Sequence, residues 1–325
     1  TDFHMDIASS IQAVTEEVVL RLTKDIAQEY KIKNLCLAGG VALNCVANGK
    51  ILRKNHFENI WIQPAAGDAG GSLGAALAYW YRELDKPREN LNDKMKGAYL
   101  GPRYEASSIE KNLKSLKAVY KEKTSSEISL SIANELANSK TVGWFQGRME
   151  FGPRALGARS ILADPRSEKM QKELNLKIKF RESFRPFAPS VLREDLNQWF
   201  DLDYDSPYML LVSDIKKEKQ IEMSEEEKKL FGIQKLNIKR SSIPAITHVD
   251  YSARIQTVHK ETNLKYYNLI TEFKKITGCP LLVNTSFNVR GEPIVCSIQD
   301  AFNCFMGTNL DILVIENFIL YKEDQ

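Results

Sequence analysis

The chain has 325 residues, of which 43% are hydrophobic and 27% are charged, and its formal net charge is +3. A chain of this length and composition supplies enough apolar side chains for two globular domains. No run approaches the roughly 20 apolar residues of a membrane span and no signal-peptide pattern opens the chain, so a cytoplasmic protein is predicted. The net charge is too small to indicate nucleic-acid binding by itself.

Strands and helices alternate among the elements predicted for the N-terminal part of the chain. Six apolar residues recur every three or four positions and indicate an amphipathic helix over roughly the first thirty residues. They are Ile7, Ile11, Val14, Val18, Leu22 and Ile26. A strand at 35–38 precedes a helix at 46–54, and a strand at 60–62 precedes a helix at 72–84. A glycine-rich turn joins strand to helix in both pairs, which predicts an α/β layer.

A polar segment at 85–93 is predicted to link this layer to a second α/β domain. Further helices are predicted at 106–116, 127–139 and 264–277, and further strands at 142–145, 208–212, 281–283 and 312–315. Gly278 is placed to end the third of these helices, and Ser297 with Asp300 predicts a capping box for the next one. The charge-rich segment 216–239 is predicted to lie on the surface.

The five cysteines show no C-x-x-C spacing, and most lie in apolar stretches. Free cysteines in such surroundings pack as small hydrophobic side chains. We therefore expect buried, reduced thiols rather than a nucleophile or a metal site at Cys36, Cys45, Cys279, Cys296 and Cys304.

Two glycine-rich turns are candidate ligand loops. The first holds Gly39, Gly40 and Asn44, where the glycines let the backbone approach a phosphate or ribose at the N-terminus of the next helix. A purely steric role for these glycines is the alternative. In the second turn, Asp68 lies at a strand end, where a carboxylate can meet a metal ion or can instead cap the following helix.

Arginines and lysines lie among glycines, prolines and aromatic residues at 151–160 and 177–189. Such neighbours hold the backbone and limit rotamers, so that a guanidinium meets phosphate as a rigid fork, although a dispersed basic surface is the alternative. Amides and hydroxyls follow the strand at 281–283, where they suit a small planar polar group or form an ordinary turn. Arg254 accompanies a lone histidine, His248, of a kind that is more often structural than catalytic. Together these segments favour polyanions such as ATP and an acyl phosphate as ligands.

Six segments in chain order resemble the NodU/CmcH/TobZ-type O-carbamoyltransferases, over nearly the whole chain. They read GGVALNCVANGKI, PAAGDAGGSLGAAL, FGPRALGARSILADPR, KIKFRESFRPFAPS, THVDYSARIQTV and PLLVNTSFNVRGEPIV. The resemblance implies an α/β fold in two domains. Residues 1–93 correspond to part of an actin-like (sugar-kinase/Hsp70-type) lobe, and residues 94–325 to a domain similar to threonylcarbamoyl-AMP synthase.

The same resemblance implies two-step chemistry. ATP and carbamoyl phosphate form carbamoyl-adenylate in the C-terminal domain, and the carbamoyl group then passes to a hydroxyl of a small-molecule or glycan acceptor beside a divalent metal ion of the Fe or Mg type. Carried onto this sequence, the residues that clamp phosphate and carbamoyl are Arg154, Lys179, Arg185 and Arg254, and those that hold the carbamoyl or adenylate portion are Asn284 and Ser286. Those that contact nucleotide in the actin-like part are Gly39, Gly40 and Asn44, and Asp68 is the metal ligand.

The sequence departs from the family at the metal site. The family has a His-x-x-x-His pair ahead of the first glycine-rich turn, whereas no two of His4, His56, His248 and His259 are four residues apart. Residues 1–93 also supply only part of an actin-like domain. We therefore expect weak binding of transition metals and no complete transfer to an acceptor by this polypeptide alone. A homodimer, or the N-terminal lobe, is the expected partner.

Two other functions compete with this interpretation. The first is a threonylcarbamoyl-AMP-forming enzyme of tRNA modification, against which the two glycine-rich turns ahead of the synthase-like domain argue. The second is an RNA-binding module in which bases stack on Phe151, Phe180, Phe184 and Phe187. The chain contains no known RNA-binding motif, so neither nucleic acid nor a membrane is predicted as a partner.

Overall fold

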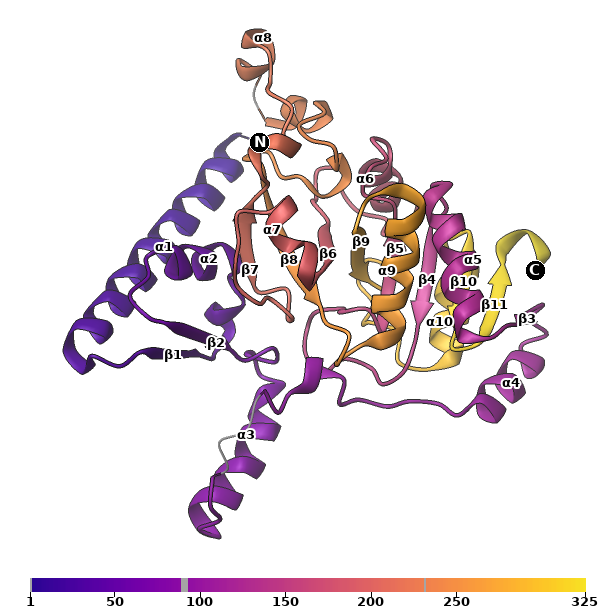
Figure 1. The fold of residues 1–325 in the computed structure, drawn as a ribbon, viewed down its shortest axis with the longest axis horizontal. Coiled ribbons are helices and arrows are strands. Elements are labelled where there is room, and N and C mark those ends of the chain that lie inside the picture. The colour runs from indigo at the N-terminus through magenta and orange to yellow at the C-terminus, as the bar shows by residue number, and fades with distance from the viewer. Residues whose placement is uncertain (1, 89–92, 231) are drawn as a thin grey trace. The chain divides into compact units, whose positions relative to one another are not determined.

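The computed structural model describes residues 2–88, 93–230 and 232–325 (Figure 1). The chain divides into two compact units, Thr1–Met95 with Leu210–Val212, and Lys96–Met209 with Ser213–Gln325. Among the described residues, no helix combines the length and apolarity that a membrane crossing requires. The assignment of 1–93 and 94–325 to the two family domains concerns domain identity and stays a prediction.

The first unit is a small α/β layer whose strands β1 and β2 pair in parallel. Its elements are α1 (Asp2–Tyr30), β1 (Asn34–Leu37), the 3₁₀ turn η1 (Gly40–Leu43), α2 (Cys45–Arg53), β2 (Asn59–Ile62), α3 (Gly70–Ala78) and the π-helical turn η2 (Tyr79–Glu83). The order of strands and helices predicted for this part is confirmed. The predicted linker includes 89–92, which lie outside the described residues.

Helix α1 forms as its periodicity predicts, but its apolar stripe is not buried by the described part of the chain. The six stripe residues, Ile7, Ile11, Val14, Val18, Leu22 and Ile26, remain 42–60% exposed. Periodicity determines which side chains share a helix face, whereas burial requires a second surface against that face.

The second unit is built on a nine-stranded sheet with the order β3-β11-β10-β4-β5-β9-β6-β8-β7. The strands are β3 (Lys121–Glu122), β4 (Val142–Phe145), β5 (Arg159–Ala163), β6 (Ala188–Leu192), β7 (Leu211–Asp214), β8 (Ser252–Val258), β9 (Leu281–Ser286), β10 (Ile312–Ile315) and β11 (Phe318–Tyr321). The pairs β4–β10 and β6–β8 are parallel, whereas β5 and β6 both run antiparallel to β9. The sheet is therefore mixed, and the predicted α/β class is confirmed.

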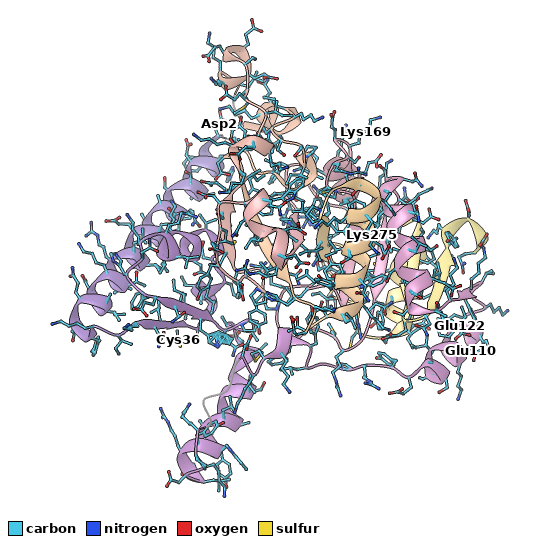
Figure 2. The ribbon with its side chains drawn as sticks, in the orientation of Figure 1. Asp2, Cys36, Glu110, Glu122, Lys169 and Lys275 are labelled. Atoms are coloured by element: carbon cyan, nitrogen blue, oxygen red, sulfur yellow. The ribbon has the colours of Figure 1, made fainter. Side chains whose placement is uncertain are left out.

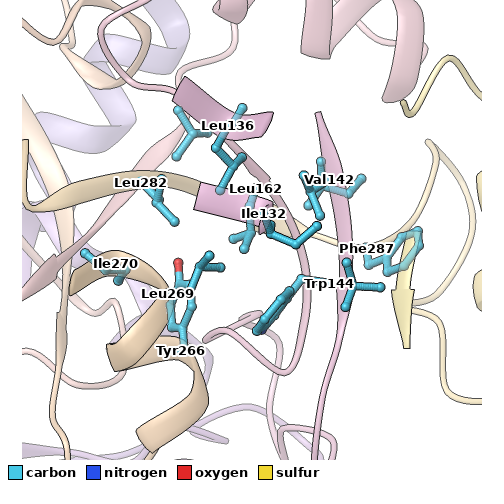
Figure 3. Close-up of a cluster of buried hydrophobic side chains, with 14 of the residues drawn as sticks. Ile132, Leu136, Val142, Trp144, Leu162, Tyr266, Leu269, Ile270, Leu282 and Phe287 are labelled. Carbon is cyan, nitrogen blue, oxygen red and sulfur yellow. The ribbon is translucent and has the colours of Figure 1, made fainter. Parts of the chain in front are cut away.

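Helices cover this sheet and complete one hydrophobic core. These helices are α4 (Ala106–Ser115), α5 (Ser125–Ala137), α6 (Met170–Glu173), α7 (Leu196–Trp199), α9 (Leu264–Thr277) and α10 (Ile298–Met306). Helix α8 (Glu225–Lys228) contributes no buried residue. Leu136 of α5 and Leu269 of α9 belong to the same buried cluster as Trp144, Leu162 and Leu282 of the strands (Figure 3). Charged side chains such as Lys275 lie on the outer surfaces of the helices (Figure 2).

The predicted helix ends are confirmed. Gly278 ends α9 in the left-handed conformation at φ 72°, and its N–H donates to Lys274 O. Ser297 and Asp300 form the expected capping box of α10, each binding the other's backbone N–H. The segment 216–239 contains the short helix α8, and most of its described residues are exposed.

Several predictions on local structure were wrong. Strands β3, β5, β6, β8 and β11 were not predicted, and the strand expected at 208–212 runs instead from Leu211 to Asp214. The stretches that form β5, β6 and β8 contain arginine, proline or polar residues, which hide the period of a strand.

The prediction of buried cysteines holds for only two of the five. Cys279 and Cys304 are buried, whereas Cys45 and Cys296 are half-buried and Cys36 is exposed. Cys36 lies on β1, where successive side chains point to opposite faces, so Leu35 is buried and its neighbour is not. An apolar neighbourhood in sequence therefore does not bury a strand residue.

Candidate functional site

A network of buried polar side chains links three neighbouring strands of the large sheet, β9, β6 and β8. Asn284 on β9 donates from Nδ2 to Ser190 Oγ on β6 at 3.0 Å and to Gln256 Oε1 on β8 at 2.8 Å. Ser190 Oγ also donates to Gln256 Oε1 at 2.6 Å. Arg254 is half-buried and precedes Gln256 by two residues on β8, so it shares the same sheet face. A buried, connected polar network of this kind is a candidate site.

The loop that holds Arg154 is attached to this network. Asn284 Nδ2 donates to Ala155 O at 3.2 Å, and Gln256 Nε2 donates to Leu156 O at 2.8 Å. Arg154 itself is half-buried. The structure therefore brings the backbone around Arg154 to Asn284 and to the strand of Arg254, three predicted residues that are far apart in sequence.

Lys179 lies at the end of β9 and contacts the predicted residue Ser286. Its Nζ donates to Ser286 O at 2.7 Å, to Asn288 O at 2.8 Å and to Asn288 Oδ1 at 2.5 Å, with Ser286 Oγ at 3.2 Å. Lys179 is only 3% exposed. Burial, with a smaller repulsion from Arg181, lowers the pKa of Lys179 to about 7. The partners in these hydrogen bonds are neutral, so an anionic ligand here would favour the charged ammonium.

Arg185 is not held rigidly, contrary to the prediction from its proline and aromatic neighbours that its guanidinium binds phosphate as a rigid fork. Its side chain is exposed, and its Nε donates to Glu182 Oε2 at 2.9 Å. The other oxygen of Glu182 accepts from Arg290 Nη1 at 3.1 Å. Arg181 is held more firmly, since its Nε donates to Asn175 Oδ1 at 2.6 Å and its guanidinium lies 5.0 Å from the centre of the Phe187 ring. The segment around Lys179 therefore presents several cations together.

Sequence reasoning missed part of this site. Arg181 follows Lys179 by two residues and Asn288 follows Ser286 by two, a spacing that was a usable signal for side chains reaching one place. Ser190 and Gln256 gave no such signal, because the strands that carry them were not predicted. Their role depends on the pairing of β6 with β8 and β9.

A cavity of about 410 Å³ opens beside Lys179. Apolar side chains line it together with the carboxylates of Glu292 and Asp300; the apolar lining includes Phe180, Val289 and Ile294. Phe180 directly follows Lys179, and Arg290 N donates to Lys179 O at 3.1 Å, which attaches the far wall to the same lysine. The cavity therefore has carboxylates and apolar groups on its walls, and Lys179 directly precedes one of its lining residues.

The candidate residues of the first unit lie in two turns that follow strands. Gly39 has φ 96°, which favours glycine, but a Cβ built on Gly39 or Gly40 meets nothing within 4 Å. Asn44 Oδ1 accepts from Ala47 N at 3.1 Å and so caps α2. Asp68 is exposed, and α3 has no side-chain cap, which is contrary to the capping alternative. The ligand roles of all four residues stay predictions.

The donor set around Asp68 does not make a metal site by itself. Within 2–88, 93–230 and 232–325, no group of three or more His, Cys, Asp or Glu side chains is arranged to hold a metal ion. Tight metal binding requires several converging ligands, and one exposed carboxylate does not supply them.

Family models decide the relationship of this chain to known proteins. The model described as "Carbamoyltransferase C-terminus" matches residues 133–322, and "Carbamoyltransferase N-terminus" matches residues 2–77. The chain belongs to the carbamoyltransferase family. The resemblance drawn from the six sequence segments is thereby confirmed.

Relatives in this family align along almost the whole length of the chain. Nodulation protein NolO of Bradyrhizobium diazoefficiens is 42% identical over 99% of this chain and 55% of its own. An uncharacterised Synechocystis protein is 58% identical over 100% of this chain and 53% of its own. Nodulation protein U of Sinorhizobium fredii is 32% identical over 88% of this chain and 46% of its own. The chain spans about half the length of these relatives.

The solved structure of HypF resembles this chain only distantly. Full-length HypF in its phosphate- and nucleotide-bound form aligns with a TM-score of 0.40 at 14% identity. The alignment covers 61% of this chain and 22% of that chain.

Proposed function

We propose that this chain forms carbamoyl-adenylate from carbamoyl phosphate and ATP, as the first step of an ATP-dependent O-carbamoyltransferase. The observation that carries the proposal is Asn284 Oδ1, a buried acceptor that receives no hydrogen bond from the described residues. A buried acceptor without a donor costs about 1–3 kcal/mol. The NH₂ of a carbamoyl group supplies such a donor, two residues along β9 from the contact between Ser286 and Lys179.

The step balances with water as a co-reactant. Water cleaves carbamoyl phosphate to carbamate and phosphate. A carbamate oxygen then attacks the α-phosphorus of ATP, the new P–O bond forms, and the P–O bond to pyrophosphate breaks. Negative charge grows on the phosphate oxygens in both parts, and fixed cations next to them stabilise the transition state. We assign this work to Arg154, Lys179, Arg185 and Arg254.

The character of the cavity next to Phe180 supports binding of the nucleoside portion of ATP there. A purine is planar and largely apolar, which suits a wall formed by Phe180, Val289 and Ile294. Ribose hydroxyls donate to carboxylates, and Glu292 on the same wall offers one. The triphosphate would then extend toward Lys179 and the arginines, so both ends of ATP meet groups of matching character.

Transfer to an acceptor belongs to the second step of the proposal. A hydroxyl of a small molecule or glycan would take the carbamoyl group, with Gly39, Gly40 and Asn44 near nucleotide and Asp68 as one metal ligand. The proposed partner is a second copy of the chain or an actin-like lobe. The exposed apolar stripe of α1 supports a partner of this kind, because apolar surface of that extent favours burial.

Pyrophosphate release tests the first step directly. We expect release from ATP to require carbamoyl phosphate, and Arg154→Ala or Arg185→Ala to slow it at least tenfold. Removing one charge-assisted contact to a transition state costs about 2–4 kcal/mol, which corresponds to that loss or more. Lys275→Ala, on the outer face of α9 and paired with Glu272, is the matched control and should leave the rate unchanged.

Two results would contradict the proposal. Full activity in both arginine variants would remove the assigned clamp. Pyrophosphate release that requires threonine and bicarbonate in place of carbamoyl phosphate would identify a threonylcarbamoyl-AMP-forming enzyme instead.

A further inference from the structure

Glu150 is a buried carboxylate in the connection between β4 and β5, outside the set of residues assigned to the reaction. Its side chain is 5% exposed. Its Oε1 accepts from three backbone N–H groups, those of Leu156 at 2.6 Å, Ala158 at 2.8 Å and Arg159 at 3.3 Å. Oε2 is buried and receives no hydrogen bond from the described residues. Burying a carboxylate costs free energy unless hydrogen bonds replace its lost hydration, and these three backbone contacts are the main replacement.

The loop that Glu150 holds is the one that carries Arg154. Gly152 at φ 139° and Gly157 at φ 97° bound it, and both values lie in the region that favours glycine. A Cβ at Gly157 would stand 2.2 Å from the Tyr266 ring, so the backbone here passes directly against α9. Arg154 lies between these two constrained glycines, and the path of the loop decides where its guanidinium points.

The loop is held from two sides. Glu150 binds the N–H of Leu156, and Gln256 donates to the carbonyl of the same residue at 2.8 Å. Asn284 donates to Ala155 O at 3.2 Å. Gln256 and Asn284 belong to the polar network of the sheet. Outside that network, Tyr99 Oη donates to Leu156 O at 2.7 Å and Trp144 Nε1 donates to Gly157 O at 3.1 Å, whereas Glu150 accepts from three of the loop's backbone N–H groups.

A buried cation accompanies Glu150 without forming an ion pair with it. Arg159 is 0% exposed, and its guanidinium lies 3.5 Å from the centre of the Phe145 ring. The guanidinium donates to four backbone carbonyls, those of Gln146, Gly147, Ala158 and Pro102. Burial raises the pKa of Glu150 above its usual value, and the backbone N–H groups of Leu156 and Ala158 and the nearby charge of Arg159 only partly oppose that rise. The three N–H donors and Arg159 all favour the anionic form.

We infer that Glu150 is a positioning residue that sets the direction of Arg154 through the backbone N–H groups of Leu156, Ala158 and Arg159. Glu150 does not touch the substrate. It acts by holding the loop against the polar network, so that the guanidinium of Arg154 meets phosphate without first ordering its own backbone. The inference rests on the proposed function, because the phosphate contact of Arg154 is part of it.

A double-mutant cycle separates positioning from general damage. Glu150→Gln keeps the shape of the side chain and one acceptor oxygen but removes the charge that favours three converging donors. We expect it to lower kcat/KM for pyrophosphate release at least tenfold in the wild-type background. In the Arg154→Ala background, Glu150→Gln should lower kcat/KM less than twofold, because the guanidinium that Glu150 positions is gone. In the Arg185→Ala background the tenfold loss should persist. Equal losses in all three backgrounds would mean that Glu150 only supports the fold, and would overturn the inference.

Amide hydrogen exchange tests the same inference without relying on activity. In Glu150→Gln the amides of Leu156 and Ala158 should exchange faster, while those of β4 and β9 stay protected. Unchanged exchange at both amides would also overturn the inference. If Glu150→Gln does not fold, Glu150→Asp takes its place, since it keeps the charge and withdraws the carboxylate by one methylene. If the wild-type chain releases no pyrophosphate, yet the amides of Leu156 and Ala158 exchange faster in Glu150→Gln than in the wild type, the proposed function alone would be contradicted.

Discussion

Lys179 differs from the other cations of the candidate site in its surroundings. The arginines keep their charge at every physiological pH, whereas burial places the pKa of Lys179 at about 7. Its hydrogen bonds to Ser286 and Asn288 hold the ammonium in place at the end of β9. The protonation of this one side chain therefore depends on whether an anion lies beside it.

ATP binding should take up a proton at Lys179. In the free protein the pKa of Lys179 is about 7, and a bound phosphate raises that pKa. The affinity for ATP is therefore constant at pH values below the pKa of free Lys179 and falls as the pH rises above it. The expected fall is up to tenfold per pH unit above about pH 7.5, where ATP phosphates no longer titrate. Calorimetry at pH 8 in buffers of different ionisation enthalpy measures the uptake. Lys179→Met should bind more weakly and without pH dependence, and the same uptake in that variant would contradict the assignment.

At the scale of elements, the site depends on where strands end and on what closes each turn. Lys179 follows the π-helical turn η4 (Leu174–Ile178), and the loop of Arg154 connects β4 to β5. Asn284, Ser190 and Gln256 meet only because β9, β6 and β8 are neighbours in the sheet. Loops positioned by a rigid sheet are the usual place for binding residues, and their backbone geometry is then part of the site.

Gly157→Ala should be more destabilising than an alanine at another left-handed glycine. Both Gly157 and Gly278 have positive φ, which costs an alanine about 1–2 kcal/mol. The new methyl group at Gly157 also meets the Tyr266 ring, which adds about 1–3 kcal/mol, whereas at Gly278 it meets nothing within 4 Å. Denaturant unfolding of the two variants gives the difference. Equal losses would show that the loop moves away from α9 at little cost.

Filling the cavity should weaken the binding of ligands that contain the nucleoside and leave the binding of pyrophosphate unchanged. Ile294→Trp places a large ring in the cavity beside Phe180, so ATP and AMP should bind at least tenfold more weakly while inorganic pyrophosphate binds as before. Arg185→Ala should weaken both kinds of ligand. Ile276→Trp, at an exposed position on α9, is the control for adding an indole and should change neither. Unchanged ATP affinity in Ile294→Trp would place the nucleoside elsewhere.

At the scale of the whole molecule, charge and aromatic side chains are arranged against an RNA-binding function. The net charge is +3, and of the four phenylalanines considered for base stacking, Phe180 and Phe184 are exposed whereas Phe187 is 3% exposed. A buried ring offers no face to a base, and the neighbouring cations are partly paired with Glu182. The arginine-rich segment is thus better suited to a compact polyanion than to a long strand.

Nucleic-acid binding should consequently be weak. We expect no sub-micromolar affinity for tRNA or single-stranded RNA at physiological salt, measured by fluorescence anisotropy. A phosphate-tracking surface would instead show affinity that falls steeply with salt concentration. Sub-micromolar binding with that steep dependence would favour the RNA-binding alternative.

The sequence by itself determined the family, the α/β class, most helices and the segments that supply the candidate site. These properties depend on local periodicity, on turn and cap residues, and on motifs such as the one that contains Arg154. The bounds of helix α9 and the capping box at Ser297 depend on residues a few positions apart, which is why both were predictable.

Only the tertiary structure decided which of these residues meet. Asn284 contacts Ser190 and Gln256 through strand pairing across long separations in sequence, and Glu150 accepts three backbone hydrogen bonds that no sequence motif predicts. Burial also depends on the tertiary structure, since Cys36 and the apolar stripe of α1 are exposed whereas Lys179 is buried. The physical reason is that local patterns specify which face a side chain occupies, whereas contact and burial depend on what the rest of the chain packs against that face.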